Sequence, residues 1–233
     1  MSERFKRTEA IFGTEKMNQL QNKRVLVFGI GGVGGYAVEA LCRSGIGTIG
    51  LVDNDTVAES NLNRQIIADE TTIGTLKTDA AHQRILKINP SCNVEKYNLF
   101  YMPDCTEIPF ESYDYVVDAI DTVTAKIDII KKCKDLNIPV ISSMGTGNKT
   151  DPTKLTVADI QKTSVCPLAR VMRHELKKRN IRNVKVVFST EEPASALVSS
   201  DRNERHVPGS FMPVPATAGL IIASRVIKDL LNI

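Results

Sequence analysis

One stretch near the start of the chain, residues 24–55, limits the fold more than any other part of the sequence. It has the pattern of a strand, a glycine turn, a helix and a second strand. Residues 25–28 form an unbroken apolar run, which is typical of a strand covered on both faces of a parallel sheet. Gly29, Gly31 and Gly34 then fit G-x-G-x-x-G, in which missing side chains allow a tight turn, close approach of a phosphate and close packing of the next helix.

An acid follows the second strand of this unit. Residues 48–52 are the strand, and Asp53 comes directly after it. In α/β proteins that bind nucleotides, an acid at this place contacts the ribose, and the phosphates lie at the N-terminus of the helix. The glycines by themselves would also fit a helix that only packs closely on a strand. Strand, turn, helix and acid in register together predict a nucleotide site.

Beyond this unit, strands and helices continue to alternate. This order predicts an α/β fold with a Rossmann-like, doubly wound, mainly parallel sheet flanked by helices and a smaller mixed C-terminal part. With 233 residues, of which 42% are hydrophobic, the chain can bury a sizeable core. The expected strands are 94–99, 113–120, 138–142, 154–160 and 185–189, and the expected helices are 15–20, 74–88, 122–137, 168–179 and 216–231.

Apolar spacing also predicts which side chains of the last two helices face the core. Residues 191–215, between the last strand and the last helix, carry four prolines and many polar side chains. This composition is typical of a loop or lid, or of plain surface disorder. In the last two helices, the side chains expected in the core are Leu168, Val171, Met172 and Leu176 of helix 168–179, and Leu220, Ile227 and Leu230 of helix 216–231.

Cysteine spacing and charge exclude several classes of protein. The five cysteines include no C-x-x-C pair, so neither a disulfide framework nor a four-thiolate zinc site is encoded, and the cytoplasm is the expected location. The net charge of +3 is too small to indicate nucleic-acid binding by itself, so local basic clusters must decide. We expect no membrane association, because the N-terminus lacks an apolar stretch and the apolar run at 218–223 is broken by Ser224 and Arg225.

A polar cluster lies just beyond the second strand. Within residues 61–65, four hydrogen-bonding side chains occupy five positions, at the sheet edge where α/β proteins bind ligands. A loop that caps the next helix would also be polar, but the neighbouring glycine turn favours a role in binding. Lys77 lies in the first turn of that helix, where the helix dipole disfavours a cation and a nearby phosphate would relieve the strain. The four side chains are Asn61, Asn63, Arg64 and Gln65.

Five motifs are spaced over the first half of the chain. They are GIGGVG at 29–34, DND at 53–55, SNLNRQ at 60–65, GTLK ending at Lys77, and DAIDT at 118–122. Together they resemble the adenylating domain of the ubiquitin-activating and molybdopterin/thiamine sulfur-carrier-activating enzymes, the ThiF/MoeB-like family. This resemblance implies an enzyme that uses ATP to convert a carboxylate into an acyl-adenylate and releases pyrophosphate.

The resemblance assigns roles residue by residue. It implies that Gly32 lies under the phosphates, Asp53 holds the ribose and Lys77 contacts a phosphate. Asp121 would assist magnesium, which prefers one or two carboxylates together with phosphate oxygens and water. A carboxylate that attacks phosphorus needs cations to offset the developing charge, so Arg64 and Lys77 are catalytic candidates beside Asp121. The implied nucleotide-binding set is Gly29, Gly31, Gly32, Gly34, Asp53, Asp55, Ser60, Asn61, Asn63, Arg64, Gln65, Lys77 and Asp121.

The second half of the chain departs from the sulfur-carrier activators. It lacks their two C-x-x-C zinc pairs and the catalytic-cysteine domain of the ubiquitin activators, which disfavours a protein tail as substrate. Its segments ISSMGTGNKTDPTKLTVADIQKT, CPLARVMRHELKKR and VVFSTE instead resemble the tRNA-modifying branch of the family. That branch adenylates the carboxylate of threonylcarbamoyladenosine in tRNA, and the neighbouring carbamoyl group closes a ring and expels AMP. No nucleophilic protein side chain is needed.

The resemblance therefore implies ATP and Mg²⁺ as cofactors and tRNA carrying threonylcarbamoyladenosine as the partner. It also allows a structural monovalent cation, Na⁺ or K⁺, and a sulfur-transfer protein as a second partner. We expect a single adenylating domain over residues 1–233, with a nucleotide-binding core at 1–145. Residues 146–233 would face the substrate and the tRNA.

Three other functions stay open at this stage. An NAD-dependent oxidoreductase would share the glycine turn and Asp53, but it would leave residues 61–65 and Lys77 without a role. A sulfur-carrier activator would need a thiol acceptor, for which Cys166 is the candidate, although a lone cysteine is more often a small buried hydrophobe. A non-catalytic protein of the same fold would bind ATP without exchanging pyrophosphate.

A basic row is predicted on the helix 168–179. If its apolar side chains face the core, the basic ones point outward, and the resemblance implies that they contact tRNA. A solvated helix face would show the same pattern. The outward residues are Arg170, Arg173, His174, Lys177, Lys178 and Arg179, of which all but His174 are proposed tRNA contacts.

A short motif precedes the first strand. Arg4-Phe5-Lys6-Arg7 matches the R-[YF]-x-R pattern with which family members supply an arginine to the ATP site of a second subunit. The resemblance thus implies a homodimer in which Arg7 is a catalytic residue of the neighbouring site. A planar guanidinium suits a polyphosphate better than lysine does. The alternative is a disordered basic tail.

Overall fold

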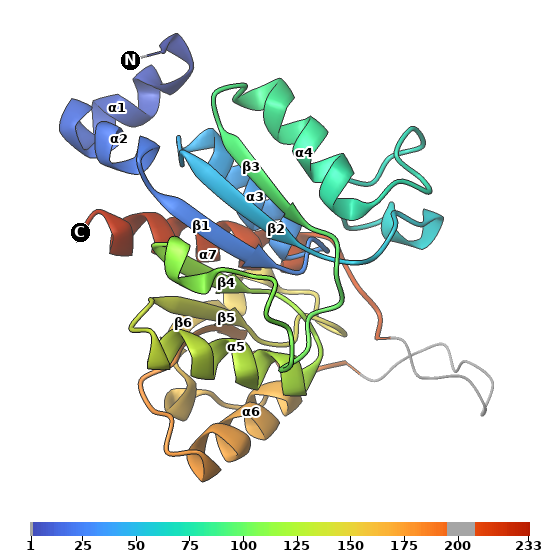
Figure 1. Cartoon of the computed structure of the whole chain (residues 1–233). Coiled ribbons are helices and arrows are strands. Elements are labelled where there is room, and N and C mark those ends of the chain that lie inside the picture. Colours follow the sequence, from blue (N-terminus) through green and yellow to red (C-terminus); the bar gives the residue numbers. More distant parts are fainter. Residues whose placement is uncertain (1, 195–207) are drawn as a thin grey trace.

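In the computed structural model, which describes residues 2–194 and 208–233, seven strands form one sheet (Figure 1). They are β1 (Arg24–Phe28), β2 (Thr48–Val52), β3 (Asn93–Tyr97), β4 (Tyr115–Asp118), β5 (Val140–Ser143), β6 (Leu155–Asp159) and β7 (Lys185–Ser189). Their order is β3-β2-β1-β4-β5-β7-β6, and neighbours are parallel except that β6 is antiparallel to β7. The predicted Rossmann-like sheet, mainly parallel with a mixed C-terminal part, is confirmed.

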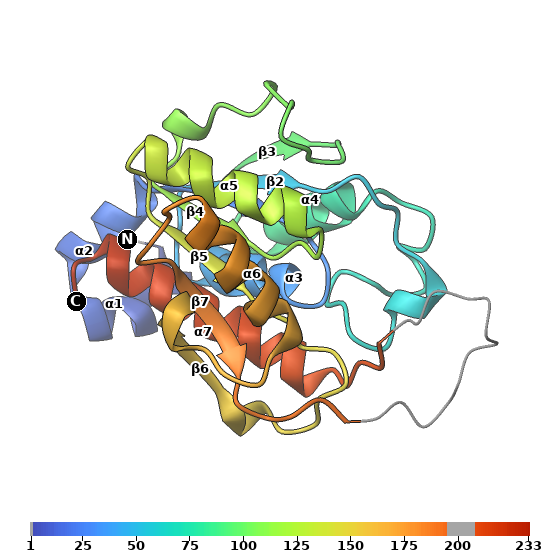
Figure 2. The ribbon, with the colours of Figure 1, turned by 90° about the horizontal axis from the view of Figure 1, so that it is seen from below.

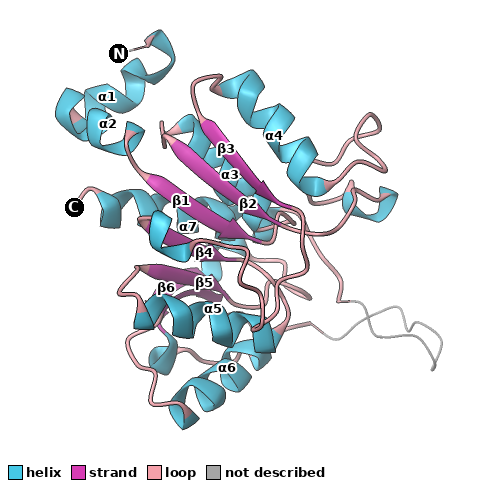
Figure 3. Cartoon of the chain, in the orientation of Figure 1, coloured by secondary structure: helices cyan, strands magenta, loops and turns pink. Residues whose placement is uncertain are grey.

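Helices cover both faces of the sheet (Figure 2, Figure 3). The helices are α1 (Lys6–Phe12), α2 (Thr14–Gln21), α3 (Gly34–Arg43), α4 (Lys77–Ile88), α5 (Val123–Asp135), α6 (Pro167–Lys178) and α7 (Pro213–Leu230). Helices α3, α4 and α7 pack on one face, against side chains such as Val25 and Leu51. Helices α5 and α6 pack on the other, against Phe28 and Val186 respectively. Because β1 is covered on both sides, its residues 25–28 are fully buried, which explains the unbroken apolar run.

Helix α7 crosses the start of α3 at very short range. A side chain at Gly219 would overlap the carbonyl of Val33, so only glycine allows this approach. The small residues Ala218 and Gly219 therefore form the buried face, together with Ile222, Ala223 and Val226. The prediction that Leu220 closes the core was wrong: it is 48% exposed, because the close packing turns it outward.

Helix α6 buries a narrower stripe than its apolar spacing predicted. Ala169, Met172 and Leu176 are fully buried, whereas Val171 is 45% exposed and does not face the core as expected. The prediction that Arg173 points outward was also wrong. Arg173 is half-buried, and its guanidinium donates to the carbonyl of Thr163. The buried stripe follows every third or fourth residue from Ala169, which leaves Val171 to one side.

The N-terminal residues are more ordered than the sequence suggested. A 3-10 turn, Glu3–Phe5, leads into α1, so Arg7 lies on a helix rather than in a disordered tail. Phe5 is 5% exposed and joins the core beside Met17. Its ring lies next to Gly45, where a Cβ would come within 3.6 Å of the phenyl carbons.

Several element boundaries differ from the expected ones. Helix α4 begins at Lys77 and not at 74, because Gly74 has φ +85°, a left-handed conformation that no α-helix contains. Helix α7 begins at Pro213, so the expected loop 191–215 ends earlier; residues 195–207 of that loop lie outside the described residues. In the described parts of the chain, no helix is both long enough and apolar enough to cross a membrane.

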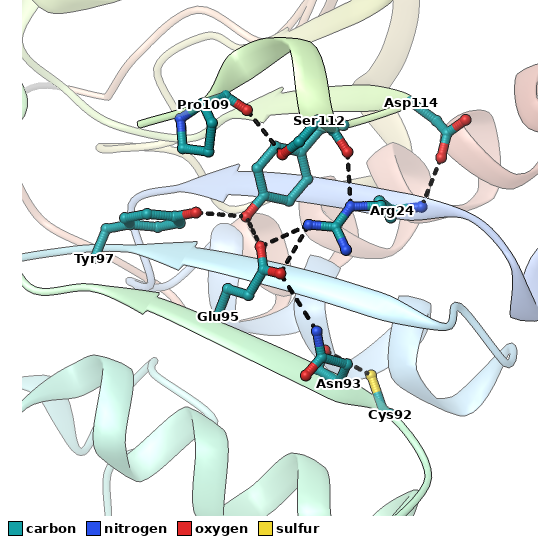
Figure 4. Close-up of polar contacts among 9 residues, drawn as sticks. Arg24, Cys92, Asn93, Glu95, Tyr97, Pro109, Ser112 and Asp114 are labelled. Atoms are coloured by element: carbon teal, nitrogen blue, oxygen red, sulfur yellow. Dashed lines mark hydrogen bonds and ion pairs between the residues drawn. The ribbon is translucent and has the colours of Figure 1, made fainter. Parts of the chain in front are cut away.

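A polar network crosses one face of β2 (Figure 4). It joins Arg24 on β1 and Glu95 on β3 to the residues just before β4. Arg24 donates to both carboxylate oxygens of Glu95, at 2.7 and 2.8 Å, and the Tyr113 hydroxyl donates to the same carboxylate at 2.5 Å. Tyr113 can reach across β2 only because Gly50 has no side chain, since a Cβ there would lie 2.5 Å from the hydroxyl. Burial opposes ionisation of Glu95, but these donors outweigh it and keep its pKa below the usual range.

Candidate nucleotide site at the switch point of the sheet

A cleft opens where the strand order reverses, between the carboxyl ends of β1 and β4. Chain connections leave these two strands in opposite directions, which is where open α/β sheets bind ligands. The cleft has a volume of about 510 Å³. Predicted site residues that line it are Gly29, Gly31, Gly32, Asp53, Asp55, Asn61, Arg64, Gln65, Lys77 and Asp121.

The glycine turn forms the floor of this cleft. Gly29 has φ +82°, and a Cβ there would lie 2.7 Å from the carbonyl oxygen of Ala119, so both the backbone and the space require glycine. A Cβ at Gly34 would overlap the Gly29 carbonyl, which explains why Gly34 supports the turn from below and does not line the cleft. Gly31 and Gly32 leave bare backbone at the start of α3, where N–H groups and the helix dipole favour a phosphate.

Asp53 ties the end of β2 to this turn. Its Oδ2 accepts from the backbone N–H of Ile30 at 2.7 Å, and its Oδ1 accepts from that of Asp55 at 2.9 Å. Each carboxylate oxygen has two lone pairs, so both still have room for one more donor such as a ribose hydroxyl. The ribose contact stays a prediction, and the structure adds a second task, the anchoring of the glycine turn.

The cluster 61–65 presents one cation, Arg64, and two amides, Asn61 and Gln65, to the cleft. Arg64 Nη1 donates to the carbonyl of Ser60 and to Asn63 Oδ1, both at 2.8 Å. Ser60 and Asn63 do not line the cleft and instead hold the guanidinium, while the aliphatic stem of Arg64 passes beside Gly32. Gln65 is 6% exposed, and among the described residues its Oε1 has no hydrogen-bond partner. A buried amide without a partner is costly, so this group fits a site completed by a polar ligand.

Lys77 and Asp55 form an ion pair at the opposite wall. Lys77 is 7% exposed, and its Nζ lies 2.7 Å from Asp55 Oδ2. This carboxylate offsets the unfavourable placement of a cation in the first turn of α4. The sequence suggested a phosphate for that task, and the structure shows that Asp55 already performs part of it.

Three of the lining residues that were not predicted as site residues come from one segment that carries none of the five motifs. Leu99, Phe100 and Tyr101 lie just after β3, beyond Asn98, and line the cleft, and Phe100 is 60% exposed. Burial and a hydrogen bond to Asp128 raise the pKa of Tyr101, so its hydroxyl stays protonated as a donor. Their position at the carboxyl end of a parallel strand could have revealed them, because all such ends meet at one edge of the sheet.

Some predicted residues lie far from this cleft. Arg7 lies on α1, beside the amino ends of the strands, whereas the cleft is at their carboxyl ends (Figure 1). The basic residues of α6 are partly engaged already, since Lys178 and Arg179 pair with Glu175 at 3.0 and 2.7 Å. Cys166 is 3% exposed and packs in the α5–α6 core.

Comparisons with known proteins extend over nearly the whole chain. A family model described as ThiF family matches residues 5–233. The tRNA threonylcarbamoyladenosine dehydratase of Bacillus subtilis is 44% identical over 244 residues, which cover 100% of this chain and 96% of that protein. Crystal structures of the E. coli enzyme of the same function, TcdA, align with TM-scores of 0.90 in complex with AMP and 0.88 in complex with ATP. They are 36% and 35% identical, and each alignment covers 99% of this chain and 94% of the other.

The family match covers the part of the chain that forms the cleft, and the TcdA structures share its fold. The glycine turn, the acid after β2 and the cations of the cleft all lie within residues 5–233, which the family model matches. This chain belongs to the ThiF family.

Proposed function

We propose that this protein is an ATP-dependent dehydratase acting on tRNA: it adenylates the carboxylate of threonylcarbamoyladenosine and promotes its cyclisation with release of AMP. The observation that carries this proposal is the cleft itself, which joins a bare glycine turn, two cations and an exposed acid. The full-length similarity to dehydratases of this name supports the choice of substrate. We further propose that residues 1–145 form the nucleotide-binding core of a single adenylating domain and that 146–233 face the tRNA.

The residues of the cleft fit ATP and magnesium. The phosphates would lie over Gly31 and Gly32. The unpartnered Gln65 Oε1 is an acceptor, so its partner would be a donor such as a nucleotide hydroxyl or a bound water. Asp121 is exposed on the cleft wall, and one carboxylate with phosphate oxygens and water is a usual Mg²⁺ ligand set. Mg²⁺ would supply charge neutralisation at the triphosphate. A structural Na⁺ or K⁺ ion is allowed as well, without assigned ligands.

The chemistry then proceeds in two balanced steps. The substrate carboxylate attacks the α-phosphorus of ATP, the bond to the β-phosphate oxygen breaks, and pyrophosphate leaves. Next, the carbamoyl nitrogen or oxygen attacks the acyl carbon, a carbamoyl N–H loses its proton to solvent, and the bond between the acyl carbon and the adenylate oxygen breaks. AMP leaves, so the nucleoside loses one water overall. Arg64 and Lys77 offset negative charge as it develops on the phosphates, and this electrostatic stabilisation is the main contribution of the site to catalysis.

The alternatives explain less of the cleft. Hydride transfer to NAD would use the glycine turn and Asp53 but neither Arg64 nor Lys77. Adenylation of a sulfur-carrier tail would be followed by transfer to a thiol, and Cys166 is buried away from the cleft. A sulfur-transfer protein therefore remains at most an additional partner. We place the enzyme in the cytoplasm, where ATP and tRNA are both present.

One experiment tests the proposal directly. The protein is incubated with ATP, Mg²⁺ and tRNA bearing linear threonylcarbamoyladenosine, and the nucleosides are analysed by mass spectrometry. The expected result is loss of one water from that nucleoside together with stoichiometric AMP. Unchanged nucleoside in the presence of bound ATP would contradict the proposal, and a matched reaction without ATP is the control.

The basic row of α6 is expected to contact tRNA. Replacing Lys177 and Lys178 with Glu should raise the apparent KM for tRNA and reduce its salt dependence without altering ATP affinity, because phosphate contacts release counterions. Lys177 and Arg170 are exposed, while Lys178 already pairs with Glu175, so Lys177 should dominate the effect. Lys87→Glu, an exposed lysine on α4, is the matched control. An unchanged KM and salt slope would remove α6 from the tRNA site.

Cys166 is expected to be dispensable for turnover. Ring closure uses an atom already held within the substrate at high effective concentration, so no protein thiol is needed. Cys166→Ser should keep its turnover while losing about 1–3 kcal/mol of unfolding free energy, because a hydroxyl enters an apolar site. Cys133→Ser, at a similarly buried position on α5, is the matched control for stability. Lost turnover with retained pyrophosphate exchange would instead indicate a thioester or persulfide step.

A further inference from the structure

A fully buried lysine lies directly behind the cleft wall. Lys126 is in the first turn of α5, 0% exposed, and its Nζ donates to the carbonyls of Ile120 and Ser143 at 3.1 and 2.9 Å. The third contact is Asp118 Oδ2, at 2.9 Å. An ammonium has three N–H donors, so all three are used.

The partner of this lysine is equally enclosed. Asp118 ends β4, is 0% exposed, and accepts a second hydrogen bond from the Ser142 hydroxyl at 2.6 Å. Taking two charges out of water costs about as much as their attraction returns, so a buried ion pair is a poor device for stability alone. Through Lys126, the pair links Asp118 at the end of β4 and Ser143 at the end of β5 to the backbone carbonyl of Ile120, which follows β4.

That backbone is the cleft wall. Residues 119–122 line the cleft, and the carbonyl oxygen of Ala119 lies 2.7 Å from the position that a Cβ of Gly29 would take, so the wall packs closely against the glycine turn. From the other side, Lys126 holds the carbonyl of Ile120, which belongs to the peptide group that joins Ile120 to Asp121. The backbone before Asp121 is therefore held by two contacts, the packing of Ala119 against Gly29 and the hydrogen bond from Lys126 to Ile120. These contacts set the direction of the exposed Asp121 side chain.

We propose that Lys126, together with Asp118, is a positioning residue that sets the direction of Asp121 in the cleft and so the affinity for Mg²⁺-ATP. This inference rests on the proposed function, because it assigns Asp121 to the metal. Loss of groups that orient a metal-binding carboxylate typically weakens the metal site about 10- to 100-fold. The same ammonium also holds Ser143, the last residue of β5 before the part of the chain that faces the substrate.

The test uses a pair of substitutions that removes the tether without leaving a buried charge. Lys126→Met alone would strand the Asp118 carboxylate, whereas Lys126→Met with Asp118→Leu replaces both charges by apolar groups, a change that buried pairs often tolerate. Binding of ATP is measured by titration calorimetry over a range of Mg²⁺ concentrations, together with the melting temperature. The double variant should fold and need about 10- to 100-fold more Mg²⁺ for half-maximal ATP binding.

A control substitution at the other end of β4 distinguishes a loss of Asp121 positioning from a general loss of stability. Tyr115 starts β4, is 1% exposed, and donates to Asp229 at 2.7 Å far from the cleft. Tyr115→Phe should lower the melting temperature and leave the Mg²⁺ requirement unchanged. In an Asp121→Ala background, removal of the Lys126–Asp118 pair should add no further loss of Mg²⁺-ATP affinity.

The outcomes are distinguishable. An unchanged Mg²⁺ requirement in the folded double variant, or losses that add fully to those of Asp121→Ala, would overturn the positioning role. Wild-type protein that binds no ATP at any Mg²⁺ concentration would instead overturn the proposed function. A Mg²⁺ requirement that rises only when Asp121 is present supports the inference.

Discussion

Asp121→Ala and Arg64→Ala are each expected to abolish AMP formation while leaving the fold intact. Arg64 offsets charge on the reacting phosphates, and an arginine in such a place can contribute about 10³- to 10⁵-fold to a phosphoryl transfer. Asp121 offers the carboxylate for Mg²⁺. Asp121 is exposed, and within the described residues the Arg64 guanidinium donates hydrogen bonds only to Ser60 and Asn63, so neither substitution opens a cavity in the apolar core.

The measurement is AMP release in the presence of tRNA, with circular dichroism melting to check folding. Arg182→Ala and Asp104→Ala remove the same charges from exposed positions away from the cleft and should keep wild-type activity. Arg64→Lys keeps the charge but not the planar fork of donors, so only partial activity is expected. Folded Asp121→Ala or Arg64→Ala protein with near-normal turnover would exclude these residues from catalysis.

Mixing two inactive variants, Arg7→Ala and Asp121→Ala, is expected to restore activity. Within one subunit, Arg7 lies on α1 at the amino ends of the strands and does not line the cleft. It can therefore act on ATP only in a neighbouring subunit, where loss of its charge should cost about 10³- to 10⁵-fold in rate. In a mixed dimer, one site receives both a wild-type Arg7 and a wild-type Asp121.

The size of the recovery can be estimated. After random exchange of subunits, half of the dimers are mixed and each has one intact site, so about one quarter of wild-type activity should return. Subunit exchange is checked separately with differently tagged chains. Mixing Asp121→Ala with Arg64→Ala is the control, because both changes fall in the same subunit's cleft and no intact site can form. A monomer in solution, or no recovery despite exchange, would refute a shared arginine.

The local pattern of the sequence was sufficient for the elements and for most of the cleft. Strand 185–189 has the predicted bounds, and the glycine turn, Asp53 and the cluster 61–65 meet at one edge as expected. Each of these depends on short-range rules, namely which residues suit a strand, a left-handed turn or a helix start. Parallel strands then bring their carboxyl ends to a common edge whatever the remaining details are.

Tertiary structure alone decided the rest, because it depends on which distant segments become neighbours. Lys126 lies in the apolar stripe of α5 by spacing, yet only the adjacency of β4 and β5 gives its ammonium three acceptors. Leu220 and Val171 face outward because the close contact at Gly219 and the stripe from Ala169 set the rotation of their helices. The sequence specifies local conformation through steric and hydrogen-bonding preferences, whereas the burial of a charge or the turning of a helix face depends on packing between segments far apart in the chain.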